Sequence, residues 1–574
     1  PMRIALARFD SLVGDVPGNS RRMLDRAVEL SNAGAQCVVF PELAMVGYPP
    51  RDLLQREGFV ASCERAVVAL AASLQNGGAG DVAVLVGTVM YVGGPGSALM
   101  NVVAVLRGGR VEATYAKRLL PDYDVFDEPR HFAAGRSPVV ISCGTQRVGI
   151  VICEDLWRAE DAVAAGHSYS IDPVAESVAA GATVIVCPSA SPCAAGKHAR
   201  HTAILRAAAQ RGGVPLCSLN ASGADDDLVF DGDARIVFPD GTAISAARWG
   251  RDALVHDFNA PPIAAARSAA TDTEGAEHAE RWHSVVIGIA GYFRKTGHSH
   301  AVLGLSGGID SALVAALACA ALGADRVTGV LMPSKFSSDG SRADAWDLAR
   351  RLGMQALEIP IEPAHDALAT HLQPYLAKVG AVLDGLVDEN LQSRLRGIQL
   401  MAFSNATGAL VLATGNKSEY AVGYSTLYGD MCGALAPIGD ILKTDVWALA
   451  RWANDHYPEL ALASGVDWHC SQPPIPEASI TKIPSAELRP DQADQDSLPP
   501  YEVLDAIVRG WVEEERSIDS IALAHQLDRA LVERWTRAID MAQYKRAQAP
   551  VIIRLSARAF GPGRRMPIVM RDIR

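Results

Sequence analysis

A short apolar run leads into a pair of glycines in Ala301-Val302-Leu303-Gly304-Leu305-Ser306-Gly307-Gly308-Ile309-Asp310-Ser311. The apolar run is typical of a buried parallel strand, and residues 312–318 form a strong helix pattern. The glycines stand where the strand must turn into a helix N-terminus, whose free N–H groups and positive dipole end attract phosphate. The pattern predicts a phosphate-binding turn, and the alternative is an ordinary turn in which Asp310 caps a helix.

The hexapeptide Ser306–Ser311 lacks the Gly-Lys-Ser/Thr ending of a P-loop. It resembles instead the SGGxDS pyrophosphate loop of the ATP pyrophosphatases, which adenylate a substrate and release pyrophosphate. The resemblance implies that ATP is a co-substrate. The residues that it assigns to ATP are Gly304, Leu305, Ser306, Gly307, Gly308, Ile309, Asp310, Ser311 and, after a later strand, Thr414.

Composition limits the classes of protein to which the chain belongs. A length of 574 residues predicts two or three domains. A net charge of −12 argues against a large nucleic-acid partner, and no apolar run is long enough for a membrane span. Ten scattered cysteines without a CxxC pair argue against structural zinc and a disulfide framework. We therefore expect a cytoplasmic protein with small-molecule partners, no nucleic acid and no membrane.

Residues 2–258 alternate strand and helix patterns, and the mixture of parallel-type and hairpin-type strands predicts a layered α/β sandwich. The expected strands are Ile4–Ala7, Cys37–Phe40, Val82–Thr88, Asn101–Leu106, Val148–Ile152, Thr183–Cys187 and Pro215–Leu219. The expected helices are Ser20–Ala33, Ala61–Leu74, Pro173–Ala179 and His198–Gln210.

Residues 259–280 have almost no apolar pattern and are predicted to be a linker. The βαβ rhythm resumes over 281–574, with strands near Val302, at Val327–Met332 and at Leu410–Ala413. This rhythm predicts a doubly wound, Rossmann-like parallel sheet, in which ligands bind at the carboxyl ends of the strands. Residues 481–496 are polar and punctuated by proline, so a mobile loop is expected there.

Three segments of the first domain place reactive groups near strand ends. Glu42 follows one expected strand, Lys117 lies in Tyr115–Pro121, and Cys153 directly follows an apolar strand. Each has an ordinary alternative: Glu42 as a turn cap, Lys117 as a solvated charge and Cys153 as one more buried cysteine. Together they resemble the Glu-Lys-Cys set of the nitrilase (carbon–nitrogen hydrolase) superfamily, which implies an α-β-β-α sandwich.

That resemblance also implies a glutaminase. A Cys153 thiolate would attack the side-chain amide of glutamine, with Glu42 as general base and acid and Lys117 stabilising the oxyanion. Tyr123, Ser191 and Lys197 would hold the amino-acid portion of glutamine. Ser191 and Lys197 have an alternative interpretation as residues at the start of a helix.

The second domain carries further polar and charged residues beyond strand ends. Asp310 and Glu419 are candidate ligands for Mg²⁺, which would neutralise a triphosphate. The family resemblance places Asn390, Glu419, Asp430, Lys443 and Lys545 around a dinucleotide, deamido-NAD⁺. Lys545 also fits an exposed basic turn.

The two halves explain each other, because an amidase releases the ammonia that an acyl adenylate consumes. The whole chain therefore resembles the glutamine-dependent NAD⁺ synthetase family, which implies a homo-oligomer. The fusion motivates a further hypothesis of a dry internal path for ammonia between Cys153 and the Ser306 loop. The alternatives are another glutamine amidotransferase, such as a GMP or asparagine synthetase, and a catalytically silent nucleotide-sensing or scaffold protein.

Overall fold

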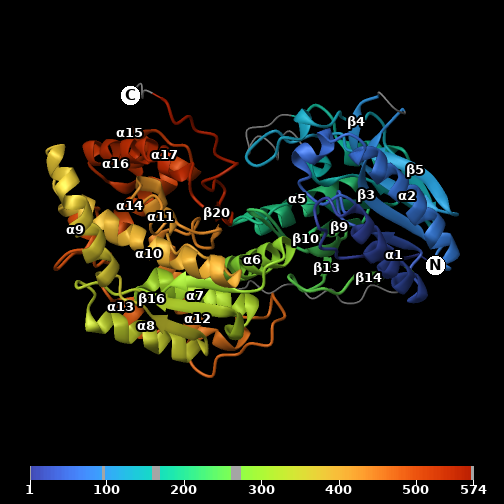
Figure 1. The fold of residues 1–574 in the computed structure, drawn as a ribbon. Helices are drawn as coiled ribbons and strands as arrows, with labels where there is room; N and C mark the ends of the chain where they lie inside the picture. Colours follow the sequence, from blue (N-terminus) through green and yellow to red (C-terminus); the bar gives the residue numbers. More distant parts are fainter. Residues whose placement is uncertain (1, 94–96, 158–168, 260–272, 571–574) are drawn as a thin grey trace. The chain divides into compact units, whose positions relative to one another are not determined.

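The computed structural model describes residues 2–93, 97–157, 169–259 and 273–570. The chain divides into two compact units, Pro1–Thr271 and Asp272–Arg574 (Figure 1). No helix within the described ranges is long and apolar enough to cross a lipid bilayer.

The first unit contains two six-stranded sheets. In spatial order, one sheet contains β14 (Leu254–Asp257), β1 (Arg3–Leu6), β2 (Cys37–Val39), β3 (Ala83–Tyr91), β4 (Leu99–Arg107) and β5 (Arg110–Ala116). The other contains β13 (Ala243–Ser245), β12 (Ala234–Val237), β9 (Leu216–Asn220), β8 (Val184–Ser189), β7 (Gln146–Ile150) and β6 (Val140–Cys143). A hairpin of β10 (Ser222–Asp225) and β11 (Leu228–Asp231) stands beside them.

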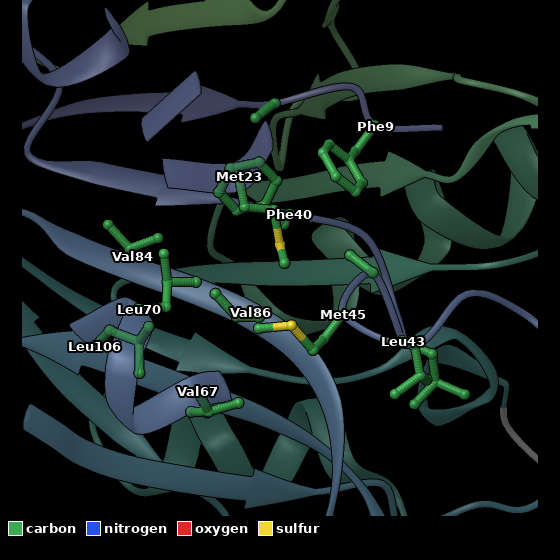
Figure 2. Close-up of a cluster of buried hydrophobic side chains, with 14 of the residues drawn as sticks. Phe9, Met23, Phe40, Leu43, Met45, Val67, Leu70, Val84, Val86 and Leu106 are labelled. Atoms are coloured by element: carbon green, nitrogen blue, oxygen red, sulfur yellow. The ribbon is translucent and has the colours of Figure 1, made fainter. Parts of the chain in front are cut away.

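Strand alternation separates three hydrophobic layers. In β3, Ala83 and Leu85 face the second sheet, whereas Val84 and Val86 face the helices α1 (Val16–Asn32) and α2 (Phe59–Asn76). Figure 2 shows this helix-facing layer, with Val67 and Leu70 of α2 turned toward the sheet. The second sheet packs on its outer side against α4 (Pro173–Ala179) and α5 (Lys197–Gly212). The α-β-β-α sandwich is confirmed.

The second unit is built on a parallel sheet in the order β17 (Gln355–Glu358), β16 (Val327–Leu331), β15 (Ala301–Gly304) and β18 (Leu410–Val411). A parallel bridge from Leu412 to Leu435 adds the pair β19 (Leu435–Ala436) and β20 (Val551–Ile552). The chain order reverses between β15 and β18, as in the doubly wound sheet predicted from the sequence. The carboxyl ends of these two strands therefore open onto one crevice.

Helices surround this sheet. They are α6 (Thr273–Thr296), α7 (Ile309–Leu322), α8 (Asp339–Leu352), α9 (Glu362–Lys378), α10 (Gly385–Thr407), α11 (Lys417–Val422), α12 (Lys443–Asp455) and α13 (Glu477–Thr481). The chain continues through α14 (Tyr501–Val508), α15 (Ile518–His525), α16 (Arg529–Met541) and α17 (Gln543–Arg546), which lie together in Figure 1.

The structure corrects the end of the predicted linker. Residues 260–272 lie outside the described ranges, but α6 begins at Thr273, inside the expected 259–280 segment. Residues 273–280 are rich in alanine and glutamate, which favour a helix without any apolar pattern. The buried Trp282, whose indole donates to the Leu460 carbonyl, anchors the helix that they extend.

Two adjacent valines of α2 test the helix-facing layer of the first unit. Val67 is fully buried and Val68 is 59% exposed. Both alanine substitutions gain the same helix propensity, so their difference isolates the cost of lost burial, about 2 kcal/mol. Val67→Ala should therefore lower the urea midpoint of this unit clearly below that of Val68→Ala. Equal midpoints would contradict the layer assignment.

Candidate active sites

Glu42 is held in a fixed orientation just beyond β2. Its side chain is 1% exposed. Oε1 accepts from the Lys117 ammonium at 2.6 Å and from the Asn101 amide at 2.8 Å, and Oε2 accepts from the Ala190 N–H at 2.9 Å. Gly87 of β3 supports this turn, because a Cβ there would lie 2.3 Å from the Pro41 carbonyl oxygen. The free lone pairs of this carboxylate are therefore presented in one defined direction.

Lys117 follows β5 and bridges two buried carboxylates. Its ammonium donates to Glu42 Oε1 and, at 2.8 Å, to Oε1 of Glu128, which also accepts from the Tyr48 hydroxyl at 3.0 Å. Burial opposes the charge, but Glu128 and Glu42 outweigh it and raise the pKa of the Lys117 ammonium well above its usual range. The sequence analysis did not assign a role to Glu128, which stands eleven residues after Lys117 in the chain.

Cys153 stands in a tight turn after β7. Its φ of 44° lies in the left-handed region, and the side chain is only 9% exposed. Burial, and next the Glu42 carboxylate, raise the pKa of the Cys153 thiol well above its usual value, with Lys117 acting in the opposite direction. The structure thus brings Glu42, Lys117 and Cys153 within electrostatic reach of one another. A thiol of this kind requires a base to become a nucleophile, and Glu42 is the carboxylate that acts on it most strongly.

Two of the three predicted glutamine-binding residues, Tyr123 and Lys197, lie near Glu154, which the sequence analysis did not assign. The Tyr123 hydroxyl donates to Glu154 at 3.1 Å, and the Tyr169 hydroxyl donates at 2.8 Å. Lys197 lies close enough to lower the pKa of the Glu154 carboxyl, although burial raises it overall. The side-chain amide of Asn220 binds the Ser191 backbone through two hydrogen bonds. It accepts one from the Ser191 N–H at 2.8 Å and donates one to the Ser191 carbonyl at 2.9 Å. A carboxylate and an ammonium beside a thiol match the two charges of an amino acid.

The balance of charges around Lys117 yields a stability prediction. Burial raises the pKa of Glu128 to about 7, with Lys117 opposing the shift and Glu42 adding to it. The pKa of Glu128 is lower in the unfolded chain. Between the two pKa values the folded state holds a proton that the unfolded chain has lost, and this contribution to stability disappears as pH rises through about 7. The Tm of the wild type relative to Glu128→Gln should therefore rise from pH 8 to pH 5.5 in calorimetry. A flat or falling difference would contradict the assignment.

The second candidate site lies at the end of β15. Gly307 has a φ of 78°, and a Cβ there would lie 2.2 Å from the Ser341 carbonyl oxygen of α8. The Ser306 and Ser311 hydroxyls are 3.1 Å apart, and the Gly308 N–H donates to Ser306 Oγ at 3.2 Å. Position 307 therefore requires glycine, because of both its backbone conformation and the lack of space for a Cβ. The turn presents hydroxyl and N–H groups at a helix N-terminus, as an anion requires.

Asp310 is the only residue of α7 that is not buried. One of its oxygens pairs with the Lys443 ammonium, and the other accepts from the Asn416 amide at 3.0 Å. Asn416 also donates its backbone N–H to Glu419 at 3.1 Å, so one residue links both predicted metal ligands. Burial, and next the Asp310 carboxylate, raise the pKa of Glu419 well above its usual value. Asp494, in the polar segment 481–496, is a further buried carboxylate near this group, missed by the sequence analysis.

These carboxylates fit a magnesium ion bound together with phosphate. Among the described residues, no group of three or more His, Cys, Asp or Glu side chains is arranged to hold a metal ion. Mg²⁺, however, usually binds through one or two carboxylates and completes its shell with water and substrate phosphates. The mutual repulsion of Asp310 and Glu419 is the kind that a divalent cation relieves.

The remaining predicted residues form a second group around the loop 423–431. Lys545 donates to the Gly423 and Ser425 carbonyls at 2.8 and 2.7 Å. Asp430 accepts from the Thr426 N–H at 2.6 Å, and Asn390 accepts from the Thr426 hydroxyl at 2.8 Å. Lys443 does not belong to this group, because it pairs with Asp310. Thr414 follows β18, the strand beside β15, and so lies at the same edge of the sheet.

The glycine pair provides a matched test of the turn. At Gly308 the backbone has an ordinary φ, and an added Cβ meets only Ser306 Oγ at 3.3 Å. Gly307→Ala must move the α8 backbone or the turn, so we expect it to weaken ATP binding at least about tenfold in calorimetry. Gly308→Ala should weaken binding less. Wild-type affinity in Gly307→Ala would contradict the site.

Comparisons with known proteins cover both units. A carbon-nitrogen hydrolase family profile matches residues 3–268, and an NAD synthase family profile matches residues 281–549. The glutamine-dependent NAD(+) synthetase of Xanthomonas campestris pv. campestris (strain 8004) is 44% identical over 99% of this chain and 97% of its own length. The protein of the same name from Synechocystis sp. (strain PCC 6803) is 40% identical over 98% of both chains.

Solved structures agree with this result. The glutamine-dependent NAD+ synthetase of Acinetobacter baumannii, solved in complex with ADP, has a TM-score of 0.73 and 32% identity over 99% of this chain and 98% of that chain. The enzyme from Cytophaga hutchinsonii shares the fold with a TM-score of 0.78, at 21% identity over 99% and 98% of the two chains. The chain therefore belongs to the family of glutamine-dependent NAD(+) synthetases.

Proposed function

We propose that this chain makes NAD⁺ from deamido-NAD⁺, ATP and glutamine, releasing AMP, pyrophosphate and glutamate. The observation that carries the proposal is the buried Lys117 ammonium, bridging Glu42 and Glu128 beside the Cys153 thiol. The same chain carries a phosphate-binding turn at Ser306–Ser311 in its second unit. Family membership sets aside the GMP synthetase, asparagine synthetase and scaffold alternatives.

In the first unit, Glu42 takes the Cys153 proton and the thiolate attacks the side-chain amide carbon of glutamine. Lys117 donates to the oxyanion, which is worth about 10²–10³-fold per donor in related chemistry. Glu42 gives this proton to the amide nitrogen. Ammonia then leaves, and the glutamyl group remains on Cys153 as a thioester. A water molecule then attacks the thioester and gives a proton to Glu42. Glutamate is released, and the proton passes from Glu42 to the Cys153 sulfur to restore the thiol.

The amino-acid end of glutamine requires both signs of charge. Lys197 is suited to its α-carboxylate and Glu154 to its α-ammonium, with Tyr123 oriented by its bond to Glu154. Ser191 lies between Ala190, whose N–H donates to Glu42, and Pro192, whose carbonyl accepts from Lys197, and its backbone is fixed by Asn220. Burial of Glu154 favours a cationic partner, because an unpaired buried carboxylate is costly.

In the second unit, the nicotinate carboxylate of deamido-NAD⁺ attacks the α-phosphorus of ATP and pyrophosphate leaves. The N–H and hydroxyl groups of Ser306–Ser311 hold the leaving group, and Thr414 contacts ATP from the neighbouring strand end. Asp310 and Glu419 would hold Mg²⁺, which would neutralise the triphosphate charge when bound. Ammonia then attacks the acyl adenylate carbon, the bond to AMP breaks, and the amide of NAD⁺ forms.

The dinucleotide is assigned to Asn390, Glu419, Asp430, Lys443 and Lys545. The mixed charges of Asp430 and Lys545, and the loop 423–431 that they hold, support this assignment. The ADP bound by the Acinetobacter baumannii relative supports adenine nucleotide binding in this family.

We also propose a homo-oligomer in a reducing, cytoplasmic setting. All ten cysteines are unpaired. Several apolar side chains from the end of α9 to the start of α10, including the segment between the two helices, are half exposed or more, namely Tyr375, Val379, Val382, Leu386 and Val387. Apolar side chains exposed this close together along the chain are a feature of many subunit interfaces. Light scattering of the purified chain measures the assembly.

Cys153→Ala tests the division of labour between the units. It removes the nucleophile, so NAD⁺ synthesis from glutamine should fall at least about 10³-fold. Synthesis from ammonium chloride should persist, because the second unit is unchanged. The assay measures pyrophosphate release and NAD⁺ with each nitrogen source.

Two variants control this experiment. Cys432→Ala, which alters a partly exposed cysteine of the second unit, should keep both activities. Asp310→Ala should abolish synthesis from either nitrogen source while glutamine hydrolysis persists. Loss of both activities in Cys153→Ala, or retention of glutamine use, would refute the assignment.

A further inference from the structure

We propose that Asp155 is a positioning residue that sets the separation of Cys153 and Lys117, an inference that rests on the proposed glutaminase function. Its carboxylate is 1% exposed and touches both catalytic segments. No role in the chemistry above requires Asp155 to contact glutamine.

One oxygen of Asp155 closes the turn that carries the nucleophile. Oδ2 accepts from the Ile152 N–H at 2.9 Å, and the Asp155 N–H donates to the Ile152 carbonyl at 2.9 Å. This reciprocal pair encloses Cys153, whose φ of 44° is unfavourable for a residue with a Cβ. The two bonds therefore hold the nucleophile in a conformation that it does not adopt readily on its own.

The other oxygen fixes the strand end that carries the lysine. Oδ1 accepts from the Arg118 N–H at 3.0 Å and from the Leu119 N–H at 2.8 Å, the two peptide groups directly after Lys117. The Tyr115 hydroxyl, two residues before Lys117, donates to Oδ2 at 2.7 Å. One carboxylate thus accepts four hydrogen bonds, from both sides of Lys117 and from the residue before Cys153.

This arrangement spans the two sheets of the first unit. Lys117 follows β5 of one sheet, and the Cys153 turn follows β7 of the other. Packing between sheets is non-directional, whereas four hydrogen bonds to one buried carboxylate specify a relative position. A misplacement of about 1 Å between reacting groups can cost about 10²-fold in rate. Asp155 is a buried group that limits such a displacement between Cys153 and Lys117.

Asp155→Asn is the sharpest variant, because it keeps the shape and replaces one acceptor oxygen by an NH₂ that faces N–H donors. We expect kcat with glutamine to fall about 10²-fold and KM for glutamine to stay near its wild-type value. Alkylation of Cys153 by iodoacetamide should slow, because the Lys117 charge that favours the thiolate is displaced. NAD⁺ synthesis from ammonium chloride should be unchanged.

Two further variants keep the proposal testable. Tyr115→Phe removes one of the four bonds and should give a smaller fall in kcat with the same unchanged KM, even if Asp155→Asn fails to melt cooperatively. Asp15→Asn makes the same chemical change at the N-cap of α1, where the side chain accepts from the Gly18 N–H, and should leave kcat unchanged.

The outcomes separate this proposal from the function on which it rests. Cys153→Ala, run in parallel, must lose glutamine use, and its failure to do so would overturn the proposed function itself. With Cys153→Ala inactive, wild-type kcat in a folded Asp155→Asn would overturn the positioning role. A rise in KM without a fall in kcat would do the same, as would wild-type kcat in Tyr115→Phe.

Discussion

The first unit depends on a single buried ammonium. The Lys117 side chain is 1% exposed and is flanked by two carboxylates that are 1% and 5% exposed. None of the three charges has water to stabilise it, so each is tolerated only because the others are in place. Removal of one partner from such a group typically costs about 3–5 kcal/mol. The same constraint matters for the chemistry, because the Glu42 carboxylate and the Lys117 ammonium both act on the buried Cys153 thiol.

The two sheets bring this centre together. Glu42 and Lys117 follow strands of one sheet, while Cys153 follows β7 and Ala190 follows β8 of the other. Ala190 donates its N–H to Glu42, so a backbone group of one sheet orients the base carried by the other. The apolar side chains between the sheets therefore affect chemistry as well as stability, because they set the distance that these polar contacts span.

In the second unit, charged residues are likewise held by hydrogen bonds, which converge on the N-terminus of the short helix α11. Asn416 binds Asp310, and Ser418 accepts from the Lys443 N–H at 2.9 Å. Lys417, fully buried, donates to Glu513, Ser556 and Arg558 and so ties the C-terminal tail to the same point. Three adjacent residues thus hold the candidate metal ligand Asp310, the C-terminal tail and the neighbouring Lys443. They are Asn416, Lys417 and Ser418, respectively.

Much of this arrangement was predictable from local pattern. The Ser306–Ser311 turn, the strands before Glu42 and Cys153 and helix α4 all followed from apolar periodicity and glycine placement. Short or edge strands such as β6, β13 and β17 were missed, because three or four residues of mixed polarity give little periodic signal. Glu128, Glu154 and Asp494 were also missed. Their importance comes from long-range burial beside other charges, which no spacing along the chain reveals.

The most direct measurement follows the nitrogen atom itself. The enzyme is supplied with ATP, deamido-NAD⁺ and glutamine labelled with ¹⁵N at the side-chain amide, and the NAD⁺ formed is examined by mass spectrometry. The account predicts ¹⁵N in the carboxamide of the nicotinamide ring from the wild type and no labelled product from Cys153→Ala. Unlabelled NAD⁺ from the wild type, or labelled NAD⁺ from Cys153→Ala, would contradict it.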